Sequence, residues 1–338
     1  MSQLKGAISS IITTYRMLWN VIRCYYARVT EKAPYSIGLD LGGTNLRAAA
    51  ISQSGELHER VEGRTAFSAG REAILNDMVR AISDLRARCG SSDLAGIGVA
   101  VPGFISLKEG VIRNSNNLAS LENFPIRDEL SQRLNAAVVL ENDANAAALG
   151  EKWMGAGREV DDLVLLTLGT GIGGGIISEG RILRGALGMA GELGHITVVP
   201  NGNPCGCGNR GCVEKHASAT AIAAMARMLG LGDLSSKEVY DLALSGNQKA
   251  QTIFVSMGEA LGIVLAMLIN TFNFPLYLFS GGPLAAWDLF APPMIEEAKR
   301  RSFTFRDTFE SKATRVEKAQ LGNEAGLYGA AYLPWLGK

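Results

Sequence analysis

The sequence predicts an α/β protein with two lobes that face each other across a central cleft. Two observations carry this prediction. A strand–turn–strand pattern with glycine-rich turns begins at Tyr35 and recurs from Leu163. Further strands and helices complete each copy, so that each copy as a whole has the order β-β-β-α-β-α. The second copy contains an insertion. Ligands of such folds bind at the carboxyl ends of the strands, so the site is expected in the cleft.

Each element of the first copy has its own signal. Apolar runs bounded by Gly, Pro or Asn predict strands, and apolar residues at helical spacing predict helices. The predicted elements are strands at 36–41, Asn45–Ser52 and from about 56, a helix over 74–85, strands at Leu94–Val101 and 137–141, and a helix at Asp143–Met154.

The second copy repeats this order. Its predicted elements are strands at Leu163–Leu168, 176–178 and 181–183, with a glycine-rich turn over 169–175, then a helix over 257–272, a strand at Leu276–Ser280, the turn Gly281-Gly282-Pro283 and a further helix. Leu39-Asp-Leu-Gly-Gly-Thr44 also parallels Leu166-Thr-Leu-Gly-Thr-Gly171 in its letters. We expect one lobe at 35–145 with about 323–338, and the other at 146–322.

Residues 1–34 precede both copies. Apolar positions at helical spacing, interrupted by Arg16, Arg23 and Arg28, predict an amphipathic helix. The stretch is too short and too charged for a transmembrane span or a signal segment. Packing on the body or on a partner chain is favoured over a membrane surface or an extension without a role.

The charge composition limits the classes of binding partner that we expect. The 338 residues contain 33 Lys plus Arg and 33 Asp plus Glu, so neither nucleic acid nor an anionic membrane is expected as a partner. Cys24 and Cys89 are isolated, which fits reduced thiols in the cytosol.

Three of the five cysteines lie within eight positions, and a histidine lies ten residues before the first of them. The set is His195, Cys205, Cys207 and Cys212. A tetrahedral Zn²⁺ site takes four such ligands from tightly turning segments. A disulfide framework is the alternative, but three cysteines cannot pair among themselves. A closed Cys3His shell indicates a structural ion, because a catalytic zinc keeps one position open.

Two glycine-rich turns offer the backbone N–H groups and hydroxyls that phosphate oxygens require. They are Asp40-Leu-Gly-Gly-Thr44 and Gly169-Thr-Gly-Ile-Gly-Gly-Gly175. Neither is a P-loop or a Rossmann turn, because a strand follows each. One such loop could be an ordinary hairpin turn. Two equivalent loops that converge on one cleft favour phosphate, and with Gly281 and Gly282 they are expected to hold the phosphates of ATP.

Asp143 stands where a predicted strand meets a predicted helix, in Glu141-Asn-Asp-Ala-Asn145. Asp is a preferred N-cap residue, so capping is one interpretation. The other is a general base, because the carboxylate also ends a strand beside the phosphate turns, where a hydroxyl nucleophile needs one.

Glu192 lies three residues before His195, and Glu214 lies two residues after Cys212. These carboxylates are either surface charges or sugar ligands that the metal site holds in place. Their spacing favours neither interpretation.

Together these residues resemble the repressor–ORF–kinase (ROK) family of sugar kinases, within the actin/hexokinase/Hsp70 superfamily. The most specific stretches are Gly188-Met-Ala-Gly-Glu-Leu-Gly-His195 and Cys205-Gly-Cys-Gly-Asn-Arg-Gly-Cys-Val-Glu214. The turns above, Val101-Pro-Gly103 and 141–145 support the resemblance, which covers about 35–338. It implies the two-lobed, ribonuclease H-like fold of actin-like ATPases with a zinc-binding loop.

The resemblance also implies residue roles. Asp143 resembles the base that takes the proton of the sugar 6-hydroxyl, and Asp40 the aspartate that helps hold Mg²⁺. The implied sugar contacts are Asn117, Asn142, Asp143, Glu192, His195 and Glu214. The implied nucleotide contacts are Asp40, Gly42, Gly43, Thr44, Asn45, Gly169, Thr170, Gly171, Gly281 and Gly282. The implied zinc ligands are His195, Cys205, Cys207 and Cys212. Asn45 stands where the family often has Lys, and Asn at this position resembles the glucose kinases of the superfamily.

The implied activity is ATP-dependent phosphorylation of glucose at O6, with Mg²⁺ and structural Zn²⁺, in a cytoplasmic homodimer. The alternatives are another sugar (mannose, fructose, N-acetylglucosamine or N-acetylmannosamine), polyphosphate as the donor, or a sugar-sensing transcriptional regulator. The regulator is disfavoured by the neutral charge, by an extension too short for a winged helix-turn-helix, and by the complete phosphate and Asp143 set.

Overall fold

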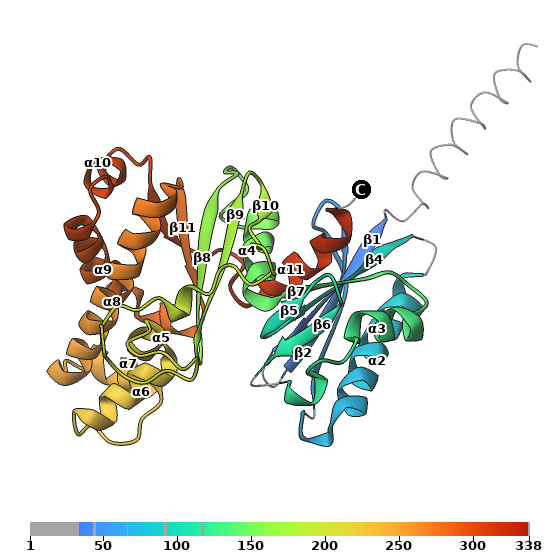
Figure 1. Ribbon diagram of the computed structural model, residues 1–338, viewed down its shortest axis with the longest axis horizontal. Coiled ribbons are helices and arrows are strands. Elements are labelled where there is room, and N and C mark those ends of the chain that lie inside the picture. The colour runs from blue at the N-terminus through green and yellow to red at the C-terminus, as the bar shows by residue number, and fades with distance from the viewer. Residues whose placement is uncertain (1–33, 43–44, 66, 91–92, 116–117, 337–338) are drawn as a thin grey trace, which may run out of the picture.

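The computed structural model describes residues 34–42, 45–65, 67–90, 93–115 and 118–336. They form two lobes, each built on a five-stranded sheet (Figure 1). The helix expected within residues 1–34 lies outside the described residues, apart from residue 34. The mixed α/β fold on two sheets that the sequence predicted is confirmed.

The first sheet has the strand order β3-β2-β1-β4-β7. Its strands are β1 (Tyr35–Leu41), β2 (Asn45–Ser52), β3 (Leu57–Arg64), β4 (Leu94–Val101) and β7 (Val138–Asn142). A short hairpin of β5 (Phe104–Ser106) and β6 (Val111–Asn114) follows β4. Strands β1 to β3 are antiparallel neighbours, and β4 and β7 add in parallel.

Helices cover both faces of this sheet, because side chains of a strand alternate between its faces. On β2, Ala48 and Ala50 belong to the core beneath α2 (Arg71–Cys89) and α3 (Ile126–Leu134). Ala49 and Ile51 pack instead with Leu327 and Ala331 of the C-terminal helix α11 (Ala325–Tyr332). The chain end therefore returns to the first lobe.

The second sheet repeats the first, with the order β10-β9-β8-β11-β12 and the same mixture of antiparallel and parallel neighbours. Its strands are β8 (Leu163–Leu168), β9 (Ile172–Ser178), β10 (Arg181–Ile182), β11 (Leu276–Ser280) and β12 (Arg315–Lys318). Its helices are α5 (Glu214–Ala217), α6 (Ala219–Met228), α7 (Ser236–Leu244), α8 (Gln248–Phe272), α9 (Trp287–Arg301) and α10 (Phe305–Glu310). The repeated strand order confirms the duplication.

The largest error in a predicted strand boundary is at the start of β9. β9 begins at Ile172, whereas the sequence predicted a glycine-rich turn over 169–175. The glycines inside β9 make room for a helix: a Cβ on Gly175 would lie 2.6 Å from the side chain of Ala148 and 2.6 Å from the carbonyl oxygen of Ala144. These glycines therefore serve close packing within a strand and not a loop.

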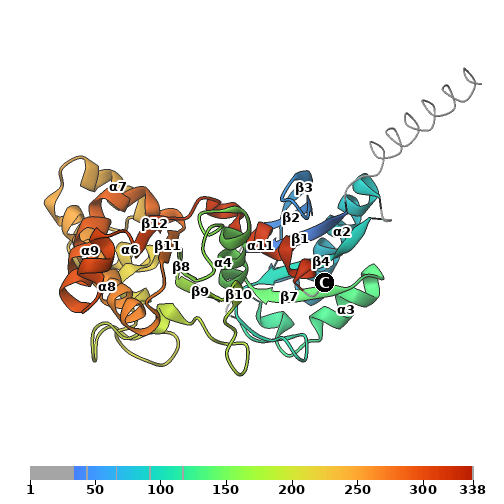
Figure 2. The ribbon, with the colours of Figure 1, turned by 90° about the horizontal axis from the view of Figure 1, so that it is seen from above.

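Helices α4 (Asp143–Met154) and α11 cross between the two sheets (Figures 1 and 2). They approach closely, since a Cβ on Gly150 would lie 2.1 Å from the carbonyl oxygen of Ala325. Glu151, fully buried on α4, accepts hydrogen bonds from the backbone N–H groups of Gln320 (3.1 Å) and Leu321 (2.7 Å), just before α11. This crossing joins the lobes beside the cleft.

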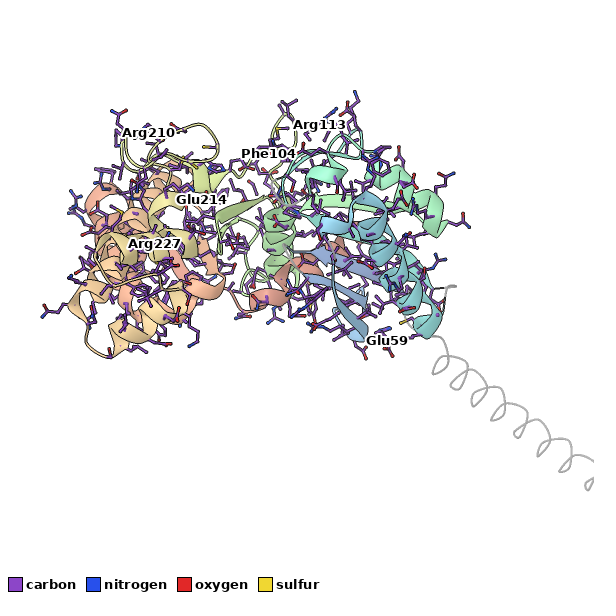
Figure 3. All side chains as sticks on the ribbon, turned by 90° about the horizontal axis from the view of Figure 1, so that it is seen from below. Glu59, Phe104, Arg113, Arg210, Glu214 and Arg227 are labelled. Carbon is purple, nitrogen blue, oxygen red and sulfur yellow. The ribbon has the colours of Figure 1, made fainter. Side chains whose placement is uncertain are left out.

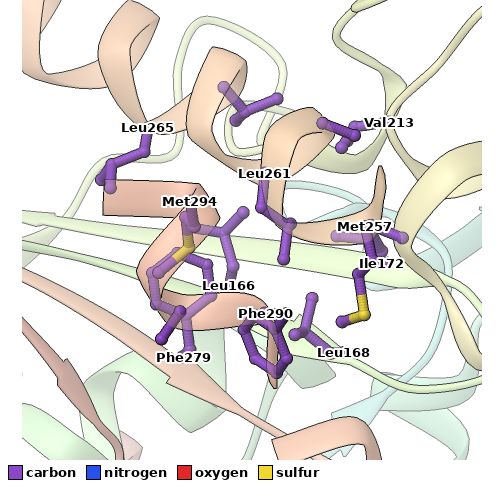
Figure 4. Packing of buried hydrophobic residues seen from close by; sticks show 14 of the residues in the cluster. Leu166, Leu168, Ile172, Val213, Met257, Leu261, Leu265, Phe279, Phe290 and Met294 are labelled. Carbon is purple, nitrogen blue, oxygen red and sulfur yellow. The ribbon is translucent and has the colours of Figure 1, made fainter. Parts of the chain in front are cut away.

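The core of the second lobe surrounds α8, which packs on α9 and over the sheet (Figure 4). Leu261 and Leu265 of this helix lie with Leu166, Phe279 and Met294 in one apolar cluster. Among the described residues α8 alone is long and apolar enough to cross a membrane, and most of its apolar stretch is buried inside the protein. Within the described residues, short 3₁₀ helices complete the fold, at Phe67–Ala69, Ala119–Leu121, Leu193–His195, Gly282–Ala286, Gly322–Glu324 and Leu333–Trp335.

Candidate active site between the lobes

The carboxyl ends of the strands bring the first group of polar residues together. Asp40 of β1 pairs with Ala100 of β4, and Val101 pairs with Asn142 of β7. Asp143, which follows β7 directly, therefore lies at the same sheet edge as Asp40. In the sequence the two aspartates are about a hundred positions apart.

A cavity of 540 Å³ opens at this edge. Five of the six predicted sugar contacts line it: Asn142, Asp143, Glu192, His195 and Glu214. Asn117 lies outside the described residues. The lining comes from both lobes, and Figure 3 labels Phe104 on the first and Glu214 on the second.

Several residues of this cavity were not predicted from the sequence. Phe104, Asn114 and Ser115 reach it through the β5–β6 hairpin, and Asn145 reaches it from the first turn of α4. Asn145 lies about half a helical turn after Asp143, so helical spacing alone does not place both side chains in one cavity. The hairpin had no clear sequence signal, since its strands span only three and four residues.

A second cavity of 520 Å³ adjoins the first and contains the predicted phosphate turns. Thr167 of β8 pairs with Ser280 of β11, so the turns after these two strands are neighbours. The predicted contacts that line it are Asp40, Gly42, Gly169, Thr170, Gly171, Gly281 and Gly282. Gly43 and Thr44 lie outside the described residues. Asn45 is exposed at the start of β2 and is not among the lining residues.

Asp143 lines both cavities. Burial raises the pKa of its carboxyl to about 7, and the negative charges of Asp40 and Glu192 add to the shift. Its Oδ1 atom accepts a hydrogen bond from the N–H of Ala144 at 2.8 Å. A carboxyl with its pKa near neutrality at the junction of two cavities has the properties of a general base.

Asp143 is not the N-cap of α4. Asn142 occupies that position, and its Oδ1 atom accepts from the N–H groups of Ala144 (2.9 Å) and Asn145 (3.1 Å). The Nδ2 atom of Asn142 donates to the carbonyl oxygen of Gly103 at 3.2 Å. Capping therefore does not account for Asp143.

Arg47 is a charged residue that lines the second cavity and was not predicted from the sequence. Its side chain contacts Asp40 at 2.6 Å and donates to the carbonyl oxygen of Asn323 at 2.5 Å. Burial outweighs this guanidinium and raises the pKa of Asp40. Side chains alternate along β2, so Arg47 lies on the same face as Asn45, a predicted nucleotide contact. This spacing was the one signal in the sequence that could have identified Arg47.

The four predicted metal ligands lie together. One nitrogen or sulfur atom from each of His195, Cys205, Cys207 and Cys212 falls within a group no wider than 4.8 Å. The Sγ atoms of Cys207 and Cys212 are 3.7 Å apart, and Sγ of Cys205 lies 3.6 Å from Nδ1 of His195. A tetrahedral zinc ion separates two thiolate sulfurs by about 3.8 Å and sulfur from nitrogen by about 3.6 Å. The donor set and its spacing fit Zn²⁺, and 3.7 Å is too long for a disulfide.

Glu214 connects this cluster to the glycine-rich turn over 169–171. Its Oε2 atom accepts a hydrogen bond from the N–H of Ile172 at 3.1 Å, and Oε1 lies 3.8 Å from Sγ of Cys205. A Cβ on Gly171 would lie 2.4 Å from Oε2 of Glu214, so a larger residue here would displace that carboxylate. Glu214 lines both cavities and is not a surface charge.

Comparison with known proteins agrees with this geometry. The sequence profile of the ROK family matches residues 36–335, so this chain belongs to the ROK family. The glucokinase of Halalkalibacterium halodurans is 36% identical over 314 residues, which cover 88% of this chain and 94% of the relative.

Two solved structures have the same architecture. The ROK hexokinase of Thermus thermophilus has a TM-score of 0.81 and 34% identity, and the match covers 90% of this chain and 98% of that one. A ROK family glucokinase from Streptomyces griseus, in complex with glucose and AMPPNP, has a TM-score of 0.71 and 32% identity, with coverage of 88% and 98%.

Proposed function

We propose that this protein transfers the γ-phosphoryl group of ATP to the 6-hydroxyl of glucose, with Asp143 as the general base. The observation that carries the proposal is the position of Asp143 on the walls of both cavities. Glucose occupies the cavity on the side of Glu192 and ATP the cavity on the side of Gly169, so that the base lies where acceptor and donor meet.

The sugar side suits a polyhydroxyl ligand. Carboxylates of Glu192 and Glu214 accept hydrogen bonds from sugar hydroxyls, and His195 and Asn142 add further polar groups. His195 turns Nδ1 toward the cysteine cluster, which leaves Nε2, 3.8 Å from Glu192, for the substrate side. The S. griseus relative that carries glucose supports this assignment.

The nucleotide side suits a triphosphate. The glycine turns of residues 169–171 and 281–282 supply backbone N–H groups, and Thr170 supplies a hydroxyl. The carboxylate of Asp40 is the kind of oxygen ligand that Mg²⁺ prefers, and a bound ion would supply neutralisation of β- and γ-phosphate charge.

A third cavity of 390 Å³ shares Gly282 with the nucleotide side and is lined mainly by apolar atoms, including those of Tyr240 and Phe254. Such surfaces suit a purine base. We assign the adenine end of ATP to this side of the cleft.

The main task of the protein is to position the sugar hydroxyl and the γ-phosphate, because phosphoryl transfer needs little covalent participation by the protein. Asp143 accepts the hydroxyl proton as the oxygen attacks the γ-phosphorus. Closure of the lobes over the two ligands excludes water and limits hydrolysis of ATP. Zinc ligation by His195 and the three cysteines fixes the loop that presents Glu192 and Glu214 to the sugar.

The proposal includes a cytoplasmic homodimer. ATP as the phosphoryl donor supports the location. Exposed apolar side chains of the second lobe, among them Met228, Leu244 and Phe303, are candidate contacts between copies. Light scattering at micromolar concentration tests the assembly.

A coupled ADP-release assay tests the activity. Glucose, mannose, fructose, N-acetylglucosamine and N-acetylmannosamine are compared, each with ATP and with polyphosphate. We expect the highest kcat/KM for glucose with ATP. A higher kcat/KM for another sugar changes the substrate but leaves the mechanism, because pocket shape alone decides between such sugars. Sugar binding without ATP turnover, together with sequence-specific DNA binding, contradicts the kinase proposal.

A further inference from the structure

Glu141 is a buried carboxylate two residues before Asp143. Its exposed fraction is 1%, and it accepts three hydrogen bonds. Oε1 accepts from the N–H of Asn142 (3.1 Å) and from Nδ2 of Asn145 (3.2 Å), while Oε2 accepts from Nε of Arg184 (2.8 Å). Burying a carboxylate is costly unless it is paired, so this arrangement calls for an explanation beyond packing.

Arg184 comes from the opposite lobe, two residues after β10 ends. Its carbonyl oxygen accepts a hydrogen bond from the N–H of Ala190 at 3.1 Å, which closes the loop 185–190 at its base. The wall of the sugar-side cavity includes Gly188 and the residues from Met189 to Glu192. Arg184 therefore links this wall of the cavity to Glu141 of the first lobe.

Asn145 adds a second link. Its side chain is buried, with Nδ2 bound to Glu141. Its Oδ1 atom has no hydrogen-bond partner among the described residues, although Asn145 lines the sugar-side cavity. The same atom lies 3.7 Å from the position that a Cβ on Gly191 would take. Glu141 thus orients an open acceptor beside the loop and the cavity.

We propose that Glu141 and Arg184 are positioning residues that fix the sugar-side loop 185–192 relative to the strand end that carries Asp143. The pair touches neither sugar nor nucleotide. It acts through Asn145 and the loop, and so controls sugar affinity and the alignment of the hydroxyl with the base. This role rests on the proposed sugar site, but the contacts that define it do not depend on the reaction.

The test compares Glu141→Gln, Arg184→Gln, Arg184→Lys and the double variant Glu141→Gln/Arg184→Gln by steady-state kinetics. Each glutamine variant is expected to raise KM for the sugar about tenfold, with KM for ATP unchanged. The double variant is expected to be no worse than either single one, since both lose the same contact. Arg184→Lys retains the charge and is expected to recover part of the affinity.

Two measurements separate positioning from stability. Hydrogen exchange of residues 185–192, measured without substrates, is expected to quicken in both glutamine variants while α8 stays protected. Lys152→Gln serves as the matched control, because it breaks an ion pair with Asp161 (3.1 Å) on the protein surface, away from both cavities.

An unchanged sugar KM with only a lower Tm overturns the proposal, as does an equal rise in KM for sugar and ATP. If Glu141→Gln does not fold, Arg184→Gln decides, because the arginine side chain is 36% exposed. If the wild type shows no sugar-dependent ATP turnover, the proposed function fails. The exchange rate of the loop still tests the pair in that case.

Discussion

The guanidinium of Arg47 lies 2.6 Å from the Oδ2 atom of Asp40, on the wall of the nucleotide-side cavity. Arg47 is the only Lys or Arg among the described residues that line this cavity. A bound triphosphate brings about four negative charges, and such a guanidinium stabilises them most in the transition state.

We therefore predict that Arg47→Gln lowers kcat about 100-fold at saturating glucose and Mg-ATP. Glucose affinity in the absence of nucleotide is expected to stay unchanged, and isothermal titration calorimetry checks this. Arg60→Gln is the control, because Arg60 lies on the adjacent strand, pairs with Glu324 and does not line the cavity. A wild-type kcat for Arg47→Gln would exclude a role for this charge.

The cluster of His195 and three cysteines yields a prediction for sugar binding. Cys207→Ser removes one ligand of the cluster and is expected to reduce bound zinc from one ion per chain to a small fraction. Without the ion the loop that holds Glu192 and Glu214 loosens, so KM for glucose rises tenfold or more while KM for ATP changes little.

Elemental analysis and kinetics on the same samples check the zinc prediction. Cys89→Ser, in the first lobe, controls for the loss of a thiol and should keep both zinc and glucose affinity. A zinc-free, folded protein with full activity rules out the scaffolding role.

Gly171 tests the contact between Glu214 and the phosphate turn. An added Cβ would lie 2.4 Å from Oε2 of Glu214, so Gly171→Ala must displace that carboxylate or the turn. Because Glu214 lines both cavities, KM is expected to rise for glucose and for ATP together. A Cβ on Gly63 in β3 meets no atom within 4 Å, so Gly63→Ala should leave both values unchanged. Unchanged KM values for Gly171→Ala would contradict a role of Glu214 in substrate binding.

Much of the fold could be predicted because the strand signals are local. Leu163–Leu168 and Leu276–Ser280 are apolar runs that end at glycine, and both strands have the predicted bounds. β12 (Arg315–Lys318) was missed because Arg, Glu and Lys occupy three of its four positions. The start of β9 was wrong because glycines inside a strand resemble a turn until the helix packed on them is known.

The residues of the candidate site also fall into a group that the sequence predicts and a group that it does not. Compact motifs identify the cysteine cluster and the phosphate turns, since their chemistry lies in neighbouring residues. Arg47 and the pair of Glu141 with Arg184 escaped notice, because the contacts depend on segments that only the tertiary fold brings together. Asn142 and Asp143 are both suitable caps by residue type, and only the geometry assigns the cap to Asn142.

The pKa of Asp143 predicts a pH dependence for catalysis. Burial raises it to about 7, and the base must be ionised to accept a proton. The kcat/KM for glucose is therefore expected to fall as the pH drops below about 7 and to level off above it. A profile that stays flat from pH 6 to pH 8 contradicts this assignment.

The same shift affects stability. Because the folded-state pKa lies above the ordinary value of 3.8, folding favours the protonated carboxyl, and this contribution is lost as the pH rises from about 4 through 7. Asp143→Asn has no charge to bury. Its Tm relative to wild type is therefore expected to increase over this pH range, as thermal unfolding without ligands at several pH values can show. A Tm difference that does not vary with pH would contradict the raised pKa.

The activity of Asp143→Asn tests the central claim most directly. Asn keeps the size and the hydrogen bond from Ala144 but cannot take the hydroxyl proton. We predict that kcat for glucose phosphorylation falls about 100-fold or more, while the fold and the Kd for glucose remain near wild type. Asp84→Asn, at an exposed position of α2, is the control. A kcat for Asp143→Asn close to that of wild type would contradict the assignment of Asp143 as the base.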